Sequence, residues 1–498
     1  MKNMTLHNIA EAVGGELFQA EGKEQREIKG AVLDSRKVEQ DYLFVATVGE
    51  RVDGHSFIEQ VFEKGALCVI CEKKPEHAKG AYILVKNSFQ ALKDMARFYR
   101  ESLDIPVVGI TGSVGKTSTK EFIASVLATH YKVLKTEGNF NNEVGLPLTV
   151  LRIKEDTEVA VLEMGISDFG EMHRLSQIAK PNICVITNIG QCHLENLGTR
   201  DGILKAKTEI FDFMKEDGSV CLNGDDDKLS TIQDVKGKKP IFFGRKKENG
   251  IYATSCENLG LSGSKAMIHC KGECFEALIP LPGEHMIQNA LAATAVGSLL
   301  GLTKEEIQKG IADVEPVGGR SHIIRKEKIT IIDDCYNANP VSMKAAIDLL
   351  TMANTRTVAI LGDMFELGSK ECELHKEVGE YAAKKNIDCI ICVGNLSKNM
   401  YEGAVSVENT VSKVYHYVDK ETLINDFGGL LKEGDSVLVK ASHGMHFEEL
   451  LDKIVSVFVI GLFPVGVERE NKMICYVCRT NRLTNIYKYR FCGCRLKG

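Results

Sequence analysis

The residues with the clearest chemical potential form the run Thr111-Gly-Ser-Val-Gly-Lys-Thr-Ser118. Its two glycines let backbone N–H groups turn inward around phosphate oxygens, and a helix that starts directly after them adds the positive end of its dipole. Lys116 can reach the terminal phosphates of a nucleotide, and the hydroxyl of Thr117 can ligate the accompanying magnesium ion. The run therefore predicts a loop that binds nucleotide phosphates. Its expected members are Gly112, Ser113, Val114, Gly115, Lys116, Thr117 and Ser118.

The loop is a variant, because the general pattern G-x-x-x-x-G-K-[ST] requires a glycine where this chain has Ile110. A glycine-rich turn before an unrelated helix is the alternative interpretation. An apolar strand over 105–110 precedes the loop, and a helix with Phe122, Ile123 and Val126 on one face follows it. This order of strand, loop and helix favours nucleotide binding.

An acid, a histidine and a lysine are expected near the same loop. Ligands of open parallel sheets bind beyond the carboxyl ends of the strands, and Glu163 ends a predicted strand over 159–163. Its carboxylate suits a hard cation such as magnesium. His193 follows a strand over 183–187, and Lys207 lies in a helical stretch. Taken alone, Glu163 also fits a helix cap or a surface acid, and the other two fit structural or solvated roles.

These side chains require parallel strands that end at one edge of a sheet. Residues 1–102 mix short elements, with strands expected over 43–46 and 67–70 and a helix over 57–64. From 103 to 315, short β-branched strands alternate with helices, which predicts a parallel sheet covered on both faces. We expect the first segment to be a smaller mixed α/β domain and the second to be a P-loop ATPase domain.

Within the central segment, a further strand is expected over 278–281 and an Ala-rich helix over 287–300. Pro316 and the glycine pair after it mark the next boundary. Residues 316–454 then alternate again as a second doubly wound α/β unit. Its expected strands cover 329–332, 357–361, 389–393 and 436–439. The fold class is therefore α/β, with three domains and mostly parallel sheets.

Composition restricts the class of protein. The 498 residues are 44% hydrophobic and 26% charged, as in an ordinary soluble globular protein, and the net charge of −6 argues against nonspecific nucleic-acid binding. The first residues hold no apolar block of signal-peptide length, and the apolar stretch 454–467 is shorter than a membrane span and interrupted by Pro464. Most of the 16 cysteines stand singly in apolar runs, which predicts buried reduced thiols. We expect a cytoplasmic protein without a membrane span.

The last segment, 455–498, has a different character. Cys475 and Cys478 are spaced as zinc ligands, but Cys492 and Cys494 are separated by one residue, which is unfavourable for a four-thiolate site. A loosely ordered appended segment is the preferred interpretation, and zinc binding is the alternative.

Several runs together resemble the Mur ligases, the cytoplasmic amide-forming enzymes of peptidoglycan synthesis. The runs are Gly109-Ile-Thr-Gly-Ser-Val-Gly-Lys-Thr-Ser-Thr119 and Thr136-Glu-Gly-Asn-Phe-Asn-Asn-Glu-Val-Gly-Leu-Pro147. Asp333-Asp-Cys-Tyr-Asn-Ala-Asn-Pro340 and Leu361-Gly-Asp-Met-Phe-Glu-Leu-Gly368 are similar to the members that add D-alanyl-D-alanine to UDP-N-acetylmuramoyl-tripeptide. The likeness covers about residues 4–453. It implies a UDP-MurNAc-binding domain over 1–102, the ATPase domain over 103–315 and a Rossmann-like domain over 316–454.

The resemblance also implies a mechanism and a set of roles. The acceptor carboxylate attacks the γ-phosphate of ATP to give an acyl phosphate, and the incoming amine then displaces phosphate. Thr117 and Glu163 are expected to bind one Mg2+ and His193 a second, with Lys207 carbamylated; Lys116, His193 and Lys207 are the expected catalytic residues. The remaining ATP contacts are expected at Asn289, Arg320 and Asp334. Substrate contacts are expected at Ser35, Arg36, Asn141, Asn142, Asn337 and Asn339, in a monomeric enzyme.

Three positions depart from the family pattern, namely Met286, His322 and His443. None of them belongs to the phosphate loop or the expected magnesium site, so they affect fine substrate contacts and not the reaction. A related ligase that adds glutamate to folate would not need the Asp34-Ser35-Arg36 segment ahead of the loop. A nucleotide-driven switch would hydrolyse ATP without cosubstrates. A noncatalytic relative is disfavoured by the intact Lys116, Thr117 and Glu163.

Overall fold

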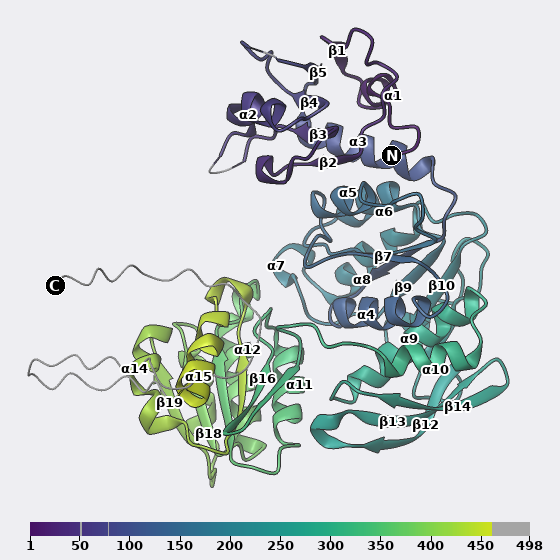
Figure 1. Cartoon of the computed structure of the whole chain (residues 1–498). Coiled ribbons are helices and arrows are strands. Elements are labelled where there is room, and N and C mark those ends of the chain that lie inside the picture. The colour runs from purple at the N-terminus through teal and green to yellow at the C-terminus, as the bar shows by residue number, and fades with distance from the viewer. Residues whose placement is uncertain (50–51, 78, 461–498) are drawn as a thin grey trace, which may run out of the picture.

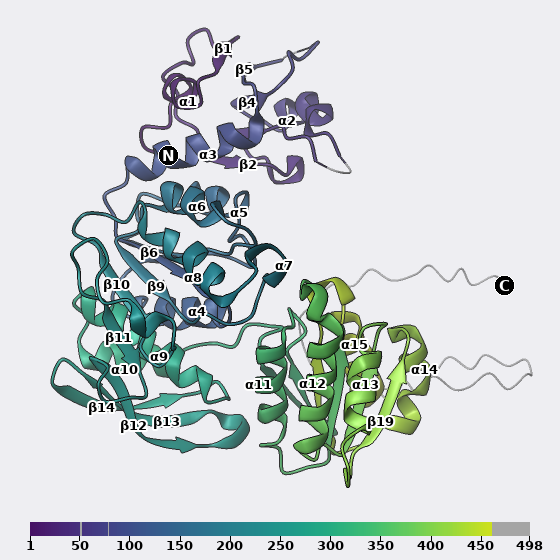
Figure 2. The ribbon, with the colours of Figure 1, turned by 180° about the vertical axis from the view of Figure 1, so that it is seen from behind.

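The computed structural model describes residues 1–49, 52–77 and 79–460 of the 498-residue chain. Within these residues the chain forms three units, each built around one sheet. Figures 1 and 2 show the first and third units on different sides of the central unit. The expected α/β class with mostly parallel sheets is confirmed.

The first unit has a five-stranded sheet in the order β1-β5-β4-β3-β2, in which only β1 is antiparallel. Helix α3 lies between this sheet and the central unit, where it contacts helices α5 and α6 (Figure 1). The expected strands over 43–46 and 67–70 and the expected helix over 57–64 are present. The elements are α1 (Leu6–Ala12), β1 (Glu16–Phe18), β2 (Gly30–Val32), η1 (Ser35–Lys37), β3 (Tyr42–Val45), η2 (Gly54–Phe57), α2 (Ile58–Glu63), β4 (Cys68–Cys71), β5 (Ala81–Leu84) and α3 (Ser88–Glu101).

The central unit has a nine-stranded sheet in the order β14-β13-β12-β11-β10-β9-β6-β8-β7. The strands from β7 to β12 run parallel, and β12, β13 and β14 form an antiparallel meander at one edge. Its strands are β6 (Val107–Thr111), β7 (Val133–Lys135), β8 (Val159–Glu163), β9 (Ile183–Ile186), β10 (Ser219–Asn223), β11 (Ile241–Gly244), β12 (Ile251–Asn258), β13 (Ser264–Cys270) and β14 (Glu273–Ile279). Its helices are α4 (Lys116–Leu127), α5 (Gly145–Val150), α6 (Glu171–Ala179), α7 (Leu194–Leu197), α8 (Arg200–Thr208), η3 (Glu209–Phe211), η4 (Leu229–Thr231), η5 (Gly260–Ser262), α9 (His285–Leu299) and α10 (Lys304–Ala312).

Both faces of the central sheet are covered because successive side chains of each buried strand point to opposite faces. In β6, Val108 and Ile110 pack against α4, α9 and α10, whereas Val107 belongs to the core that α5, α6 and α8 cover. The parallel strands therefore read as continuous apolar runs, which is why β6, β8 and β9 could be predicted.

The expected strand over 278–281 is placed too late. The strand in this region is β14, Glu273–Ile279, and residues 280 and 281 lie beyond its end. β14 alternates exposed and buried positions, with Phe275, Ala277 and Ile279 turned inward. In such a half-buried strand polar and apolar residues alternate, so consecutive apolar residues occur only at its end. The apolar pattern of the sequence therefore predicts the end of the strand and misses its beginning.

The third unit has a six-stranded sheet in the order β15-β16-β20-β17-β18-β19, in which only β15 is antiparallel. Helices α11, α12 and α13 cover one face, and α14 and α15 cover the other. The strands are β15 (His322–Lys326), β16 (Ile329–Asp333), β17 (Thr357–Gly362), β18 (Cys389–Val393), β19 (Lys413–Tyr417) and β20 (Ser436–Lys440). The helices are α11 (Pro340–Leu350), η6 (Gly368–Lys370), α12 (Glu371–Lys384), α13 (Lys398–Val405), α14 (Lys420–Leu430), η7 (His443–Met445) and α15 (Glu448–Ile460).

Helix α15 continues past residue 455, where the atypical last segment was expected to begin. The cysteines at 475, 478, 492 and 494 lie outside the described residues. In the part of the chain that is described, every cysteine is a free thiol and most are buried. No helix in that part combines the length and the apolar character needed to cross a bilayer.

Candidate active site

A cleft of about 700 Å³ lies where the carboxyl ends of the central strands face those of the third sheet. The phosphate loop and Glu163 line it from the central unit, and the segments after β16, β17 and β20 line it from the third unit. Ligands of open α/β sheets bind at such edges. The expected site residues in its lining are Ser113, Val114, Gly115, Lys116, Thr117, Ser118, Asn141, Asn142, Glu163, His193, Asn289, Arg320, Asp334, Asn337 and Asn339.

The phosphate loop joins β6 directly to α4, as its sequence predicts. Gly115 precedes α4 with φ 82° and Gly112 has φ 152°, a backbone conformation that glycine adopts at little cost. Lys116 starts α4, and its ammonium donates a hydrogen bond to the carbonyl of Gly112 at 2.8 Å. The loop thus presents the N-terminus of a helix and a lysine to the cleft, which is a site for polyphosphate.

Asn188 stabilises the phosphate loop through hydrogen bonds to Ser113 and Val114, a role that the sequence did not suggest. Its side-chain oxygen accepts from the N–H of Val114 at 2.9 Å, and its amide donates to the carbonyl of the same residue at 2.9 Å. Its own carbonyl accepts from the N–H of Ser113 at 3.1 Å. A detectable signal was its position directly after a predicted strand, since the carboxyl end of β9 lies beside that of β6.

Gly112→Ala is expected to abolish tight nucleotide binding. A Cβ at this position would overlap the hydroxyl of Thr187, and a side chain at positive φ costs about 1–2 kcal/mol in addition. The measurement is ADP binding by calorimetry. Gly428→Ala is the matched control, because a Cβ there meets nothing within 4 Å. Unchanged ADP affinity in the Gly112 variant would contradict the role of this loop.

Glu163 and Thr117 form the candidate magnesium site. The Thr117 hydroxyl donates to Oε2 of Glu163 at 3.0 Å, and the side-chain amide of Asn141 donates to Oε1 at 2.8 Å. Only 2% of Glu163 is exposed, and the ammonium of Lys120 lies 3.9 Å from its carboxylate. A carboxylate and a hydroxyl fixed beside a phosphate loop fit Mg2+, which takes one or two protein oxygens together with phosphates and water. Accordingly, the described residues contain no cluster of three or more His, Cys, Asp or Glu side chains suited to a metal.

His193 connects the central unit to the third unit. It stands directly before α7 with φ 51°, and its Nδ1 lies 2.9 Å from Oε2 of Glu366. The hydrogen bond from His193 lowers the pKa of the Glu366 carboxyl. Glu366 lies in the run Leu361–Gly368, which resembles the Mur ligases, but the sequence alone gives this acid no role.

Lys207 lies on α8 and is 1% exposed. Burial lowers the pKa of its ammonium to about 8, and the positive charge of Lys116 acts in the same direction. Lys207 is not among the residues that line the cleft. A lysine that loses its proton this easily has a nucleophilic amine at a pH where surface lysines remain charged.

Three further expected nucleotide contacts come from helix α9 and the third unit. Asn289 accepts a hydrogen bond from the Thr119 hydroxyl at 2.9 Å. The guanidinium of Arg320 lies 3.9 Å from the ring centre of Tyr336, a stacking partner that the sequence did not reveal. Asp334 accepts from the N–H of Ser321 at 2.9 Å and from the ammonium of Lys440 at 2.6 Å.

The expected substrate asparagines at the cleft also stabilise their own loops. Asn142 accepts from the N–H of Gly145 at the start of α5, and Asn339 caps α11 by accepting from the N–H of Ser342. The side-chain oxygen of Asn337 accepts from the N–H of Ala338. Their amide NH2 groups are the atoms with which these side chains can meet a ligand.

Ser35 and Arg36 lie in η1 of the first unit and do not line the cleft. Ser35 is buried, and its carbonyl accepts from the ammonium of Lys64 at 2.9 Å. Arg36 is largely exposed and pairs with Asp34 at 2.9 Å, which lowers the pKa of that carboxyl to about 2. The structure therefore places Arg36 at the surface of the first unit and Ser35 beneath it.

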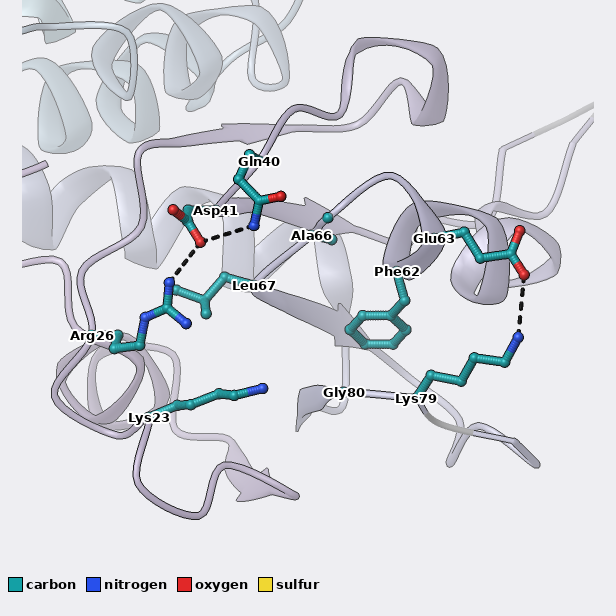
Figure 3. Close-up of a pocket in the computed structure, with 11 residues that line it drawn as sticks. Lys23, Arg26, Gln40, Asp41, Phe62, Glu63, Ala66, Leu67, Lys79 and Gly80 are labelled. Atoms are coloured by element: carbon teal, nitrogen blue, oxygen red, sulfur yellow. Dashed lines mark hydrogen bonds and ion pairs between the residues drawn. The ribbon is translucent and has the colours of Figure 1, made fainter.

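The first unit has a smaller hollow of about 260 Å³ at the amino ends of β3, β4 and β5 (Figure 3). Arg26 pairs there with Asp41 at 2.7 Å, and Lys79 pairs with Glu63 at 3.2 Å. These pairs neutralise four charged side chains of the lining, and Lys23 adds one further positive charge. Ser35 and Arg36 do not line it.

The structure shows the local surroundings of the three departures noted in the sequence. The sulfur of Met286 accepts from the amide of Asn289 at 3.4 Å. The ring of His443 lies 5.4 Å from that of Tyr336, and His322 begins β15.

Comparisons with known proteins agree with this arrangement. The Mur ligase middle domain matches residues 110–297, the glutamate ligase domain of the Mur ligases matches 319–443, and the Mur ligase family catalytic domain matches 27–100. The UDP-N-acetylmuramoyl-tripeptide–D-alanyl-D-alanine ligase of Bacillus subtilis is 40% identical over 462 residues, which are 91% of this chain and 99% of that protein.

Solved structures give the same picture. MurF from Acinetobacter baumannii is 32% identical with a TM-score of 0.82, over 91% of this chain and 98% of that one. MurF from Thermotoga maritima, in complex with ADP, is 29% identical with a TM-score of 0.76, over 87% of this chain and 98% of that one.

Proposed function

The chain belongs to the Mur ligase family, and on this premise we propose that it joins D-alanyl-D-alanine to UDP-N-acetylmuramoyl-tripeptide with conversion of ATP to ADP and phosphate. The observation that carries the proposal is the cleft that combines the phosphate loop and Glu163 with Arg320 and Asp334 of the third unit. The names of relatives that match over nearly their whole length support the choice of substrates.

The reaction has two steps. The terminal carboxylate of the tripeptide attacks the γ-phosphorus, ADP leaves, and an acyl phosphate remains. The amine of D-alanyl-D-alanine then attacks the acyl carbon, phosphate leaves and the amine loses a proton. Phosphoryl transfer depends mainly on positioning and on positive charge. In this chain the loop N–H groups and Lys116 hold the phosphates, and Thr117 and Glu163 hold magnesium, which neutralises the charge that spreads over the phosphate oxygens.

Lys207 and His193 complete the proposed cation sites. The neutral amine of Lys207 attacks CO2 and loses a proton, which converts a buried ammonium into a carboxylate-like carbamate. The lowered pKa near 8 favours this step, because only the unprotonated amine reacts. The imidazole of His193 is the proposed ligand of a second magnesium ion.

The roles of the other site residues are assigned from the resemblance to the Mur ligases. Arg320 is assigned to ATP phosphate, Asp334 to ribose and Asn289 to the surroundings of adenine. Ser35 and Arg36 are assigned to the uridine nucleotide, Asn141 and Asn142 to the muramoyl-peptide, and Asn337 and Asn339 to the dipeptide. We propose that the enzyme acts in the cytoplasm as a monomer.

Incubation of the pure protein with ATP, Mg2+, D-alanyl-D-alanine and UDP-MurNAc-tripeptide is expected to give the pentapeptide nucleotide. Mass spectrometry follows the product, and release of phosphate follows ATP. Omission of either cosubstrate should nearly stop phosphate release, which distinguishes a ligase from a nucleotide-driven switch. Absence of the pentapeptide nucleotide at saturating substrates would reject the proposed acceptor and donor, and glutamate addition to folate would identify the competing ligase.

A further inference from the structure

Lys440 is a buried lysine at the carboxyl end of β20, and its position in the cleft has no role in the reaction described so far. Only 2% of the residue is exposed. Its ammonium lies 2.6 Å from Oδ2 of Asp334, 2.9 Å from the carbonyl of Asn337 and 3.4 Å from the carbonyl of Asp334. All three contacts are made to one short turn, residues 334–337.

The contacts of Lys440 fix the conformation of that turn. An ammonium taken out of water needs a negative partner and acceptors for its three N–H groups, and this turn provides them. Asp334 is 8% exposed, so its carboxylate in return depends on Lys440 and on the N–H of Ser321. Loss of the ammonium would leave a buried carboxylate with one neutral donor and release the carbonyl of Asn337.

The turn connects two parts of the cleft with different proposed ligands. Asp334 at its start is assigned to the ribose of ATP, and Asn337 at its end is assigned to the dipeptide. Asn339 follows and caps α11. The same ammonium therefore determines the positions of a nucleotide contact and of a dipeptide contact.

The turn also faces the central unit through His285, at the start of α9. The charges of Asp334 and Lys440 both act on the imidazole of His285, in opposite directions. Because the two charges form a close pair, the central unit meets a nearly neutral group at this boundary.

We propose that Lys440 is a positioning residue that orients Asp334 for ATP and Asn337 for D-alanyl-D-alanine at the same time. The identity of the second ligand rests on the proposed function. Because the acceptor nucleotide is assigned to Ser35, Arg36, Asn141 and Asn142, its binding does not depend on this turn. A lysine that only stabilises the fold would not distinguish among the three substrates.

The test is Lys440→Met in the full-length protein, with KM measured for each substrate. We expect KM for ATP and for D-alanyl-D-alanine to rise about tenfold each, the usual effect of losing a charge-assisted hydrogen bond. KM for UDP-MurNAc-tripeptide is expected to stay within about twofold of wild type. ADP affinity by calorimetry should fall about tenfold, and Lys440→Arg should recover part of it. An equal rise in all three KM values, or no rise for ATP and the dipeptide, would overturn the proposal.

Two further comparisons keep the test decisive. Lys328→Met removes an exposed lysine of the same unit that pairs with Glu433, and it should leave all three KM values unchanged. If Lys440→Met does not fold, Lys440→Gln takes its place. The same result is expected, namely a higher KM for ATP and for D-alanyl-D-alanine and an unchanged KM for UDP-MurNAc-tripeptide. If wild type forms no pentapeptide nucleotide, the proposed function fails; ADP binding then still decides whether Lys440 orients Asp334.

Discussion

Lys116→Ala is expected to lower kcat/KM for ATP by about a hundred- to a thousandfold, because it removes the ammonium that the phosphate loop presents to the nucleotide. The lysine starts α4 and reaches across its own loop to the carbonyl of Gly112. A nucleotide phosphate offers the ammonium a charged acceptor in place of that carbonyl. The measurement is the initial rate of phosphate release in the complete reaction.

Lys132→Ala is the matched control for this change. Lys132 follows α4, its side chain is 69% exposed, and it pairs only with Asp156 at the surface. Its replacement should alter the rate by less than about twofold. A Lys116→Ala enzyme with wild-type kcat/KM would show that the phosphate loop does not bind the reacting nucleotide.

Lys207→Ala is expected to reduce kcat by about a hundredfold or more, because it removes the group that becomes the carbamate. Short carboxylates such as acetate or propionate should restore part of the rate, since the deletion leaves room for an anion at the buried position. Wild type treated with ¹³C-bicarbonate should give a carbamate signal in the NMR spectrum that the variant lacks. Full activity of the variant, or a wild-type spectrum without that signal, would refute the carbamate.

The pH dependence of the carbamate follows from the pKa of Lys207. Burial lowers this pKa to about 8, so the reactive neutral amine increases as the pH rises through that value. Removal of CO2 should therefore inactivate the enzyme most readily below pH 8, and added bicarbonate should reverse the loss. Lys205→Ala, two residues away on the same helix but exposed, should leave the signal and the rate unchanged.

The buried parallel strands could be predicted because they are continuous runs of apolar residues. β8 and β18 have the same bounds in the prediction and in the structure, Val159–Glu163 and Cys389–Val393. The meander β12–β14 could not be predicted in this way, because its strands alternate polar and apolar residues and its pairing depends on neighbours in the sheet. The phosphate loop could be predicted from the sequence because the residues expected to bind phosphate are consecutive in the chain.

The contacts that organise the cleft join residues far apart in the chain, so a single sequence does not reveal them. Asn188 holds Val114, Tyr336 stacks with Arg320, and Glu366 meets His193. Lys440 was accessible in principle, because it follows the predicted strand 436–439 just as Glu163 ends the strand 159–163. In both places a charged residue at the carboxyl end of a buried strand faces the cleft.

The contact between His193 and Glu366 makes the second proposed cation site conditional on docking of the third unit. A carboxylate on Nδ1 orients the imidazole and raises the basicity of Nε2, the nitrogen left for a metal. Without the third unit in this position, the histidine would lack this carboxylate and would be a weaker, less ordered ligand. ATP bound before the third unit docks would then meet an incomplete set of the proposed cations, which would limit wasteful attack by water on the nucleotide.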